Sequence, residues 1–235
     1  MNDDQPPVPR YRYLAPNGVT AANISCGFIS MVMAADGKYD LAVYLLVVAI
    51  VLDTLDGNIA RWLHATSEFG QEMDSFSDAL SFGAAPAFLV YHAILRDMAP
   101  FGLTVALVYL LCAVLRLTRF NISSDAHAKE RRTIGAPVPV AASYLMVAVL
   151  IRDQVRPAHV ILLVLMVAGL MVSRIQMPNL KGRNLVTVML LVGIVNYLVV
   201  IFNPCWNTII WWNVWNALIL VAAWIQDRRL EDQSA

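Results

Sequence analysis

Charged residues are scarce in this chain of 235 residues, where Asp, Glu, Lys and Arg together make up 14%. Soluble domains carry about 25% charged residues, so the composition excludes an ordinary soluble domain. Hydrophobic residues account for 59% of the chain and the mean hydropathy is +0.61, which indicates that lipid is the solvent. The formal net charge is zero, and this argues against nucleic acid as a partner.

Cysteine pairs and a signal peptide are also missing. Cys26, Cys112 and Cys205 are far apart and form no CxxC motif, which excludes a disulfide framework and leaves them as small apolar packing residues. Residues 1–16 are polar and rich in proline, where a cleavable signal would place its apolar core. Membrane insertion is therefore expected to depend on the spans themselves.

Long apolar runs dominate the rest of the chain. A membrane span needs about 20 mostly apolar residues. Eight segments qualify, some marginally: 18–35, 41–63, 69–94, 99–121, 135–151, 157–173, 185–203 and 207–226. The sequence predicts an all-α integral membrane protein with about eight transmembrane helices.

The distribution of basic residues predicts the orientation. With the N-terminus inside, thirteen of the 17 Lys and Arg residues fall in inside segments, and four fall in outside loops: Lys38, Arg96, Arg152 and Arg156. Positive charge is retained on the cytoplasmic side. We expect both termini to be cytoplasmic, with the protein in the cytoplasmic (inner) membrane.

Four carboxylates interrupt the second and third spans: Asp53, Asp56, Asp74 and Asp78. Each carboxylate inside a span costs about 2.5–3.5 kcal/mol on insertion scales, so the four must be compensated. Helix-terminal acids that pair with loop arginines would explain one or two of them, but not four. Divalent cations are the natural compensation.

The spacing of these acids places them on two helical stripes. Residues at i, i+3, i+4 and i+7 share one face of a helix, and two sets follow this spacing: Asp53, Asp56, Gly57 and Ala60, and Gly70, Asp74 and Asp78. A short turn near 64–68 joins the two spans, so they are expected to run antiparallel with their acidic faces in contact. The predicted site lies at their cytoplasmic ends.

The ligand chemistry of this site favours hard cations. Oxygen-only ligands favour Mg²⁺, Mn²⁺ or Ca²⁺ over Zn²⁺, and four carboxylates carry too much charge for a single divalent ion. Two metals about 3.5–4 Å apart are typical of phosphoryl-group displacement. Gly57 and Ala60 leave room for a ligand beside the acids, and Arg61 is placed to hold a phosphate.

These residues carry a family resemblance. The pattern D-x2-D-G-x2-A-R-x8-G-x3-D-x3-D runs from Asp53 to Asp78 without a departure, and it resembles the signature of the CDP-alcohol phosphatidyltransferases. The resemblance implies that the four acids bind two divalent metals, Mg²⁺ or Mn²⁺, and that Asp78 is also a general base. It implies a CDP-linked lipid and a small alcohol as substrates, a phospholipid and CMP as products, and a homodimer.

The same resemblance implies a six-span core. Residues 17–175 would form this core, 1–16 a cytoplasmic N-terminal segment, and 176–235 two additional spans with a short cytoplasmic tail. Within the core, Gly57, Ala60, Arg61 and Gly70 would contact the CDP-lipid.

Further segments resemble one subgroup, the bacterial and archaeal-type (type II) phosphatidylserine synthases. They are P-N-x-x-T-x-x-N from Pro16, D-x-x-S-F-G-x-A-P-A from Asp78, R-x-x-R-F-N from Arg116, G-x-P-x-P from Gly135, and the run Leu170–Ser173. Ala136 stands where leucine is common in the subgroup. This resemblance implies transfer of a phosphatidyl group from CDP-diacylglycerol to L-serine.

Substrate contacts can be proposed at two places. Asn17, Thr20 and Asn23 share one face near the start of the first span; they are expected either to bind the cytidine or its ribose, or to make an N-cap and interhelical bonds. A second group is predicted at the serine site, where arginine can bind a carboxylate with two hydrogen bonds: Ser81, Arg116, Arg119 and Asn121. Headgroup contact is the alternative for the two arginines.

Two other functions stay open. In one alternative the acceptor alcohol is glycerol 3-phosphate or an inositol phosphate. A phosphorylated acceptor would require additional cationic residues near the site. In the other, the chain is a divalent-cation transporter, although transporters place such acids near the bilayer midplane. Direct displacement is favoured over a covalent phosphatidyl-enzyme, which the sequence does not exclude.

Overall fold

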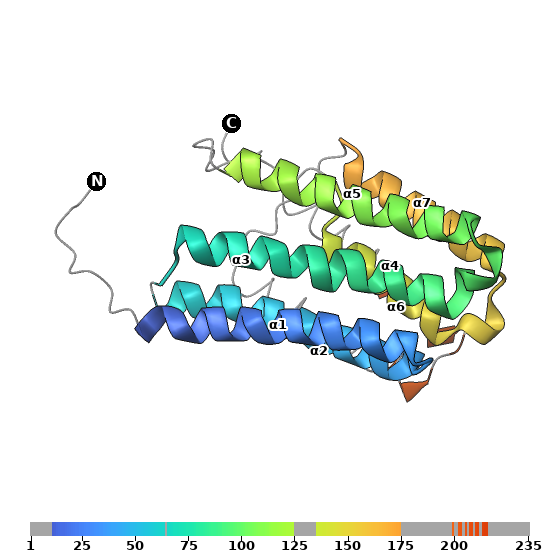
Figure 1. Cartoon of the computed structure of the whole chain (residues 1–235), viewed down its shortest axis with the longest axis horizontal. Coiled ribbons are helices and arrows are strands. Elements are labelled where there is room, and N and C mark those ends of the chain that lie inside the picture. Colours follow the sequence, from blue (N-terminus) through green and yellow to red (C-terminus); the bar gives the residue numbers. More distant parts are fainter. Residues whose placement is uncertain are drawn as a thin grey trace.

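The computed structural model describes residues 11–63, 65–124 and 135–174, with scattered positions between 199 and 215. In these parts of the chain every regular element is a helix, and the long helices lie side by side along one direction (Figure 1). Four helical stretches are long and apolar enough to cross a membrane: Tyr13–Ala35, Tyr39–Trp62, Glu68–Met98 and Phe101–Ile122. The prediction of an all-α membrane protein is confirmed.

The first six predicted spans each correspond to a helix, but they differ in length. α6 (Val138–Leu150) and α7 (Pro157–Val172) are apolar and shorter than the four long stretches. The predicted spans 185–203 and 207–226 lie largely outside the described residues, so the expected total of about eight stays a prediction.

The first two helices form a hairpin. α1 (Tyr11–Ala35) ends at the turn Asp36-Gly37-Lys38, and α2 (Tyr39–Trp62) returns along it. Gly37 has a φ of 76°, a left-handed conformation that glycine adopts without steric cost. The Ser30 hydroxyl donates a hydrogen bond to the Ala42 carbonyl, 2.9 Å away, which fixes the two helices where they meet.

The third span is one long rod with two widened turns. It begins with α3 (Glu68–Asp78), which continues through a π-helical turn at Ala79–Ala84 (η1) into α4 (Ala85–Val90). A second π-helical turn at Tyr91–Leu95 (η2) and a 3₁₀ turn at Arg96–Met98 (η3) end the rod. Pro86 has no N–H for the Phe82 carbonyl four residues earlier. The buried Tyr109 hydroxyl donates to that carbonyl instead, at 3.0 Å. The sequence predicted an ordinary helix over 69–94 and missed this feature.

The remaining helices pack against the hairpin and the rod. α5 (Phe101–Ser124) supplies Tyr109 and runs beside α7, and nearly all of α6 is buried. The core consists of apolar side chains from all of these elements, the largest fully buried ones including Leu46, Phe82, Leu89, Tyr109, Leu145, Met146 and Met171.

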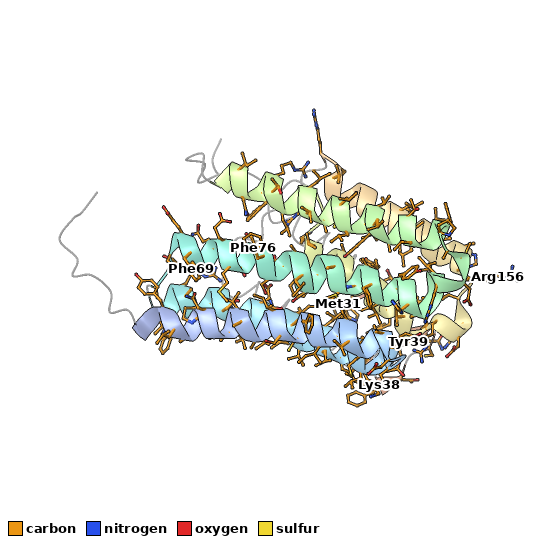
Figure 2. All side chains as sticks on the ribbon, in the orientation of Figure 1. Met31, Lys38, Tyr39, Phe69, Phe76 and Arg156 are labelled. Carbon is orange, nitrogen blue, oxygen red and sulfur yellow. The ribbon has the colours of Figure 1, made fainter. Side chains whose placement is uncertain are left out.

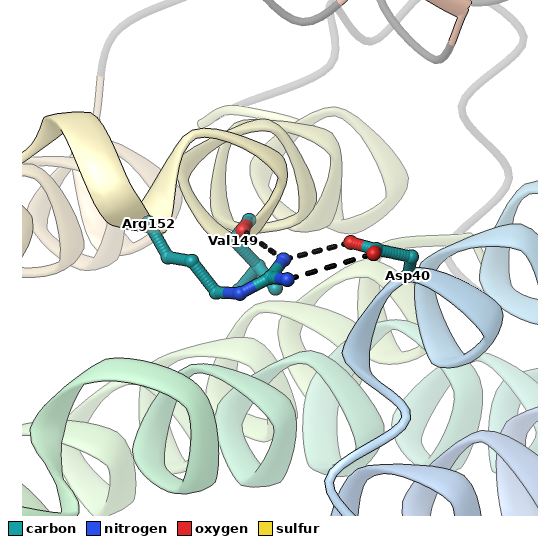
Figure 3. A network of polar contacts seen from close by, with 3 residues as sticks. All are labelled: Asp40, Val149 and Arg152. Atoms are coloured by element: carbon teal, nitrogen blue, oxygen red, sulfur yellow. Dashed lines mark hydrogen bonds and ion pairs between the residues drawn. The ribbon is translucent and has the colours of Figure 1, made fainter.

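An ion pair joins the helices at one end of the bundle, which we call the far end. Arg152, in the short 3₁₀ turn Arg152–Gln154 (η4), places Nη1 2.7 Å from Oδ1 of Asp40 and 3.2 Å from the Val149 carbonyl (Figure 3). Its guanidinium also lies 5.5 Å from the centre of the Tyr39 ring. The Tyr39 hydroxyl in turn donates to the His92 carbonyl at 3.1 Å. The start of α2, the η4 turn and η2 are thus connected.

We expect Tyr109→Phe to lower the free energy of unfolding by about 0.5–1.5 kcal/mol, because a buried hydrogen bond is lost. For a chain of this size each kcal/mol lowers the thermal midpoint by about 2–4 °C. Thermal unfolding in detergent micelles measures the change. Tyr44→Phe is the matched control, since Tyr44 is 40% exposed, and a midpoint equal to that of the control would contradict the assignment.

Candidate active site

The four acidic side chains meet between α2 and α3, at the end of the bundle opposite Asp40. Asp53, Asp56 and Asp74 each offer a carboxylate oxygen, and these oxygens all lie within 4.8 Å of one another. The Asp78 carboxyl is within hydrogen-bonding reach of Asp53. We call these four residues the acid cluster and this end of the bundle the acid end. Figure 2 shows Phe69 toward the acid end, and Lys38 and Tyr39 at the far end.

A tight connection between α2 and α3 brings the acids together. Ser67 is the N-cap of α3, and its hydroxyl accepts a hydrogen bond from the Gly70 N–H at 3.0 Å. A Cβ at position 70 would lie 3.1 Å from Ser67 Oγ and 3.5 Å from Asn17 Oδ1. The missing side chain of Gly70 therefore lets α1 and the cap of α3 approach each other beside the acids.

Asp56 is held by α1 as well as by its own helix. The Thr20 hydroxyl lies 2.7 Å from Oδ2 of Asp56, and the Gly57 N–H donates to Oδ1 at 2.6 Å. Asp56 is buried, with 4% of its surface exposed. Two donors thus fix the orientation of one carboxylate while leaving lone pairs on both of its oxygens.

The donor set fits divalent cations. In the described part of the chain, Oδ1 of Asp74 and Oδ1 of Asp78 are buried and have no hydrogen-bond partner, although buried polar atoms are normally paired. All the candidate ligands are carboxylate oxygens, which suit hard cations. Cations bound to Asp53, Asp56, Asp74 and Asp78 would satisfy these oxygens and reduce the repulsion among the four acids.

A cavity of about 200 Å³ opens beside the acid cluster. Asp56 and Asp74 line it, together with six of the seven residues predicted to contact the CDP-lipid: Asn17, Thr20, Gly57, Ala60, Arg61 and Gly70. The Arg61 guanidinium is exposed and lies 3.0 Å from Oδ1 of Asn58. Gly57 leaves the cavity open, because a Cβ there would meet only the Arg61 guanidinium, at 3.8 Å.

Several lining residues escaped the sequence reasoning: Pro16, Ala65, Thr66, Ser67 and Gln71. Ser67 carries a recognisable signal, because a serine just before a helix is a common N-cap. Gln71 lies three residues before Asp74 and so shares its face of α3. Pro16 opens the P-N-x-x-T-x-x-N segment but was not predicted to line a site. Ala65 and Thr66 carry no chemical signal and line the cavity because they lie in the connection between α2 and α3.

Asn23 and Ser81 do not line this cavity. Asn23 is fully buried, and neither atom of its side-chain amide has a hydrogen-bond partner among the described residues. The Ser81 hydroxyl donates to the Asn23 backbone carbonyl at 3.1 Å. A Cβ at Gly27 would collide with Ser81, so small residues bring α1 and η1 together here.

Besides Ser81, the three other residues predicted for the serine site are divided among three places. Arg116 is buried, with 8% exposed; its guanidinium lies 5.4 Å from the centre of the Phe120 ring and interacts favourably with the Asp78 carboxyl. Asn121 donates to the Ser75 hydroxyl of α3 at 3.0 Å. Arg119 donates to three backbone carbonyls at the end of α7. Of these residues, Arg116 is the one near enough to the acid cluster for its charge to act on Asp78, although the described residues include no hydrogen bond between the two.

Known proteins resemble this chain over the region that holds the site. The family model for CDP-alcohol phosphatidyltransferase matches residues 13–175. A CDP-diacylglycerol–serine O-phosphatidyltransferase of Helicobacter pylori is 33% identical over 175 residues, which cover 72% of this chain and 73% of the relative. The enzyme of the same name from Bacillus subtilis is 36% identical over 166 residues, covering 69% and 89%. An archaetidylserine synthase of Methanothermobacter thermautotrophicus is 32% identical over 174 residues, covering 72% and 71%.

We expect Mn²⁺ to bind the purified protein, and Asp56→Asn and Asp74→Asn each to weaken that binding by at least about 10–100-fold, the loss typical of disturbing a metal site. Each variant removes a negative charge and a ligand oxygen. Titration followed by electron paramagnetic resonance of free Mn²⁺ measures the affinity without an enzyme assay. Asp97→Asn, in the η3 turn at the far end, is the control, and equal affinities for all three variants would disprove the site.

Proposed function

This chain belongs to the CDP-alcohol phosphatidyltransferase family, and from that premise we propose that it transfers the phosphatidyl group of CDP-diacylglycerol to the hydroxyl of L-serine. Phosphatidylserine and CMP are the products. We place the catalytic core at residues 17–175, with 1–16 and 176–235 as additions to it. The family homodimer stays a prediction.

One observation carries the proposal: the acid cluster borders a cavity whose walls are small or polar residues from α1, α2, α3 and the connection between α2 and α3. Gly57, Ala60 and Gly70 leave space next to Asp56 and Asp74, which suits a ligand whose phosphates must approach bound cations. Arg61, at the end of α2, supplies a fixed positive charge for the pyrophosphate. Asn17 and Thr20 supply polar groups for the cytidine or its ribose.

Divalent cations held by Asp53, Asp56, Asp74 and Asp78 would polarise the pyrophosphate and stabilise the charge on the departing CMP. We assign Mg²⁺ or Mn²⁺ to this role, with Ca²⁺ as a possible occupant. Thr20 and the Gly57 N–H keep the Asp56 carboxylate oriented in the cluster.

Asp78 is proposed as the general base. Its carboxylate takes the proton of the serine hydroxyl as the serine oxygen attacks the lipid-side phosphorus. A new oxygen–phosphorus bond forms while the bond from that phosphorus to the CMP oxygen breaks. General base catalysis of this kind contributes about 10²–10⁴-fold. We favour this direct displacement over a covalent phosphatidyl-enzyme.

Arg116 is the proposed partner of the serine carboxylate. It is the arginine that interacts with Asp78, and a bidentate guanidinium matches a carboxylate. A carboxylate bound there would place the serine hydroxyl near the general base. The relatives from Helicobacter pylori and Bacillus subtilis support serine as acceptor by their names. The roles predicted for Arg119, Asn121 and Ser81 in binding serine stay predictions, and Arg119 is considered again below.

The orientation prediction can be tested by labelling. We place the protein in the cytoplasmic membrane with the acid end toward the cytoplasm, because the positive-inside rule assigns thirteen of the 17 basic residues to that side. In a background with Cys26, Cys112 and Cys205 replaced by alanine, Asp153→Cys should react with an impermeant maleimide in intact cells. His127→Cys should react only after lysis, and the reverse pattern would overturn the orientation.

The acceptor prediction is tested with purified protein. L-serine should support CMP release from CDP-diacylglycerol, whereas glycerol 3-phosphate and inositol phosphate should not. Arg116→Lys should raise the KM for serine by about 10-fold and change the KM for CDP-diacylglycerol much less, since lysine cannot replace a bidentate arginine.

Arg96→Lys, in the η3 turn at the far end, is the control for this substitution and should match the wild type. A preference for a phosphorylated alcohol would overturn serine as acceptor while leaving the transferase chemistry in place. A larger change in the KM for CDP-diacylglycerol would move Arg116 to the phosphate site.

A further inference from the structure

Three segments that are far apart in the sequence come together at the end of α7. The Arg119 guanidinium of α5 donates to the carbonyls of Val172, Met171 and Ser173 at 3.2, 3.4 and 3.3 Å. The Ala136 N–H, just before α6, donates to the Leu170 carbonyl at 3.2 Å. We call this group of contacts the α7 clamp.

The chemistry of a helix end explains why an arginine lies here. The last carbonyls of a helix have no intrahelical donors, and a positive charge near them interacts favourably with the helix dipole. The last turn of α7 contains no basic residue of its own. The planar guanidinium carries five N–H donors in a fixed arrangement, and so one side chain from α5 can serve several carbonyls.

Gly135 is part of the same group. Its φ of 78° lies in the left-handed region. A Cβ at this position would collide with the Met171 carbonyl and lie 2.9 Å from Nη2 of Arg119. Any side chain at position 135 would therefore push against both members of the clamp, the end of α7 and the arginine that caps it.

The clamp lies close to Arg116, the proposed partner of the serine carboxylate. Arg116 is one helical turn before Arg119 on the same face of α5, and it interacts with Asp78. On the other side of this segment, Asn121 is hydrogen-bonded to Ser75 of α3. Residues 116–121 are thus attached to α3 through Asn121 and to α7 through Arg119. Arg116, at the start of this segment, is buried.

We infer that Arg119 is a positioning residue, which with Gly135 fastens α5 to the end of α7 and so keeps Arg116 at its buried place near Asp78. Arg119 then acts on the acceptor alcohol through Arg116 and not by contact. The inference rests on the proposed function only for the role of Arg116 in binding the acceptor.

The test compares Arg119→Gln, Arg119→Lys and Gly135→Ala with Gly37→Ala. Gly37 has nearly the same φ, 76°, but a Cβ there would meet nothing within 4 Å. Gly37→Ala therefore controls for backbone strain, because it introduces a side chain at a positive φ without pushing against neighbouring atoms. For each protein we would measure the thermal midpoint in detergent and the KM values of both substrates from CMP release.

We expect Arg119→Gln and Gly135→Ala each to raise the acceptor KM by about 10-fold, with the CDP-diacylglycerol KM within about twofold of wild type, since small displacements at a site are costly. Both should also lower the midpoint. Gly37→Ala should lower the midpoint and leave the acceptor KM unchanged. Arg119→Lys should recover part of the loss, and the Arg119→Gln/Gly135→Ala double variant should resemble Arg119→Gln, because both changes disturb one contact.

Two results would overturn the inference. In the first, Arg119→Gln raises the acceptor KM, but Gly135→Ala has the same acceptor KM as the control Gly37→Ala. Arg119 would then touch the acceptor directly. If both variants lower the midpoint without changing the acceptor KM, the clamp is only structural. Should Arg119→Gln fail to fold, Arg119→Lys and Gly135→Ala decide between these results. Should wild-type protein use another alcohol, serine is wrong as acceptor, and the same comparison is made with that alcohol.

Discussion

Four carboxylates, one buried and three partly buried, lie close together in an apolar helical bundle, where they repel one another and lose part of the hydration they would have in water. Each carboxylate therefore needs a hydrogen-bond donor or an opposite charge, and neighbouring elements provide some of these partners. Thr20 and the Gly57 N–H serve Asp56, and Arg116 offsets charge at Asp78. One oxygen each of Asp74 and Asp78 has no hydrogen-bond partner among the described residues, which leaves room for cations. Helices α1, α2, α3 and α5 must hold their places for this balance to exist.

Close helix contacts meet that requirement at the acid end. Gly70 allows Asn17 and the Ser67 cap to lie beside the acids, and Gly27 allows α1 to contact Ser81. At the far end, the Arg152–Asp40 pair connects α2 with the η4 turn. A partly exposed ion pair contributes only about 0–1 kcal/mol, so the apolar core between the two ends supplies most of the stability.

Features that depend on local spacing could be predicted from the sequence. The i, i+3, i+4 pattern of Asp53, Asp56 and Gly57 and the short turn before α3 were enough to predict that two acidic faces meet, because both are properties of neighbouring residues. The positions of the first six helices follow from apolar runs in the same way. Gly57, Ala60, Arg61 and Gly70 line one cavity for the same reason, whereas Asn17 and Thr20 join them from α1 through helix packing.

Features that depend on distant contacts could not be predicted. Nothing near Pro86 in the sequence indicates that Tyr109, on another helix, donates to the Phe82 carbonyl. Arginine is the residue type expected to bind a substrate carboxylate, yet the Arg119 guanidinium donates to carbonyls at the end of α7, more than 50 residues later. Asn23 belongs to the same helical face as Thr20, but the approach of η1 buries it. Each outcome depends on which helix lies next to which.

The short length of α6 and α7 has a consequence for the surrounding bilayer. With 13 and 16 residues, they are about 20 and 24 Å long at 1.5 Å per residue, whereas the hydrocarbon layer is about 30 Å thick. Both stop short of the acid end that the other helices reach (Figure 1). Local thinning of the membrane is one way in which a lipid-facing segment shorter than the hydrocarbon layer is accommodated. Since nearly all of α6 is buried in the protein, this applies to α7, where Leu162 and Met166 are exposed. We expect the polar boundary to lie further inward along α7, which would shorten the distance between a water-soluble substrate and the headgroup of a lipid one.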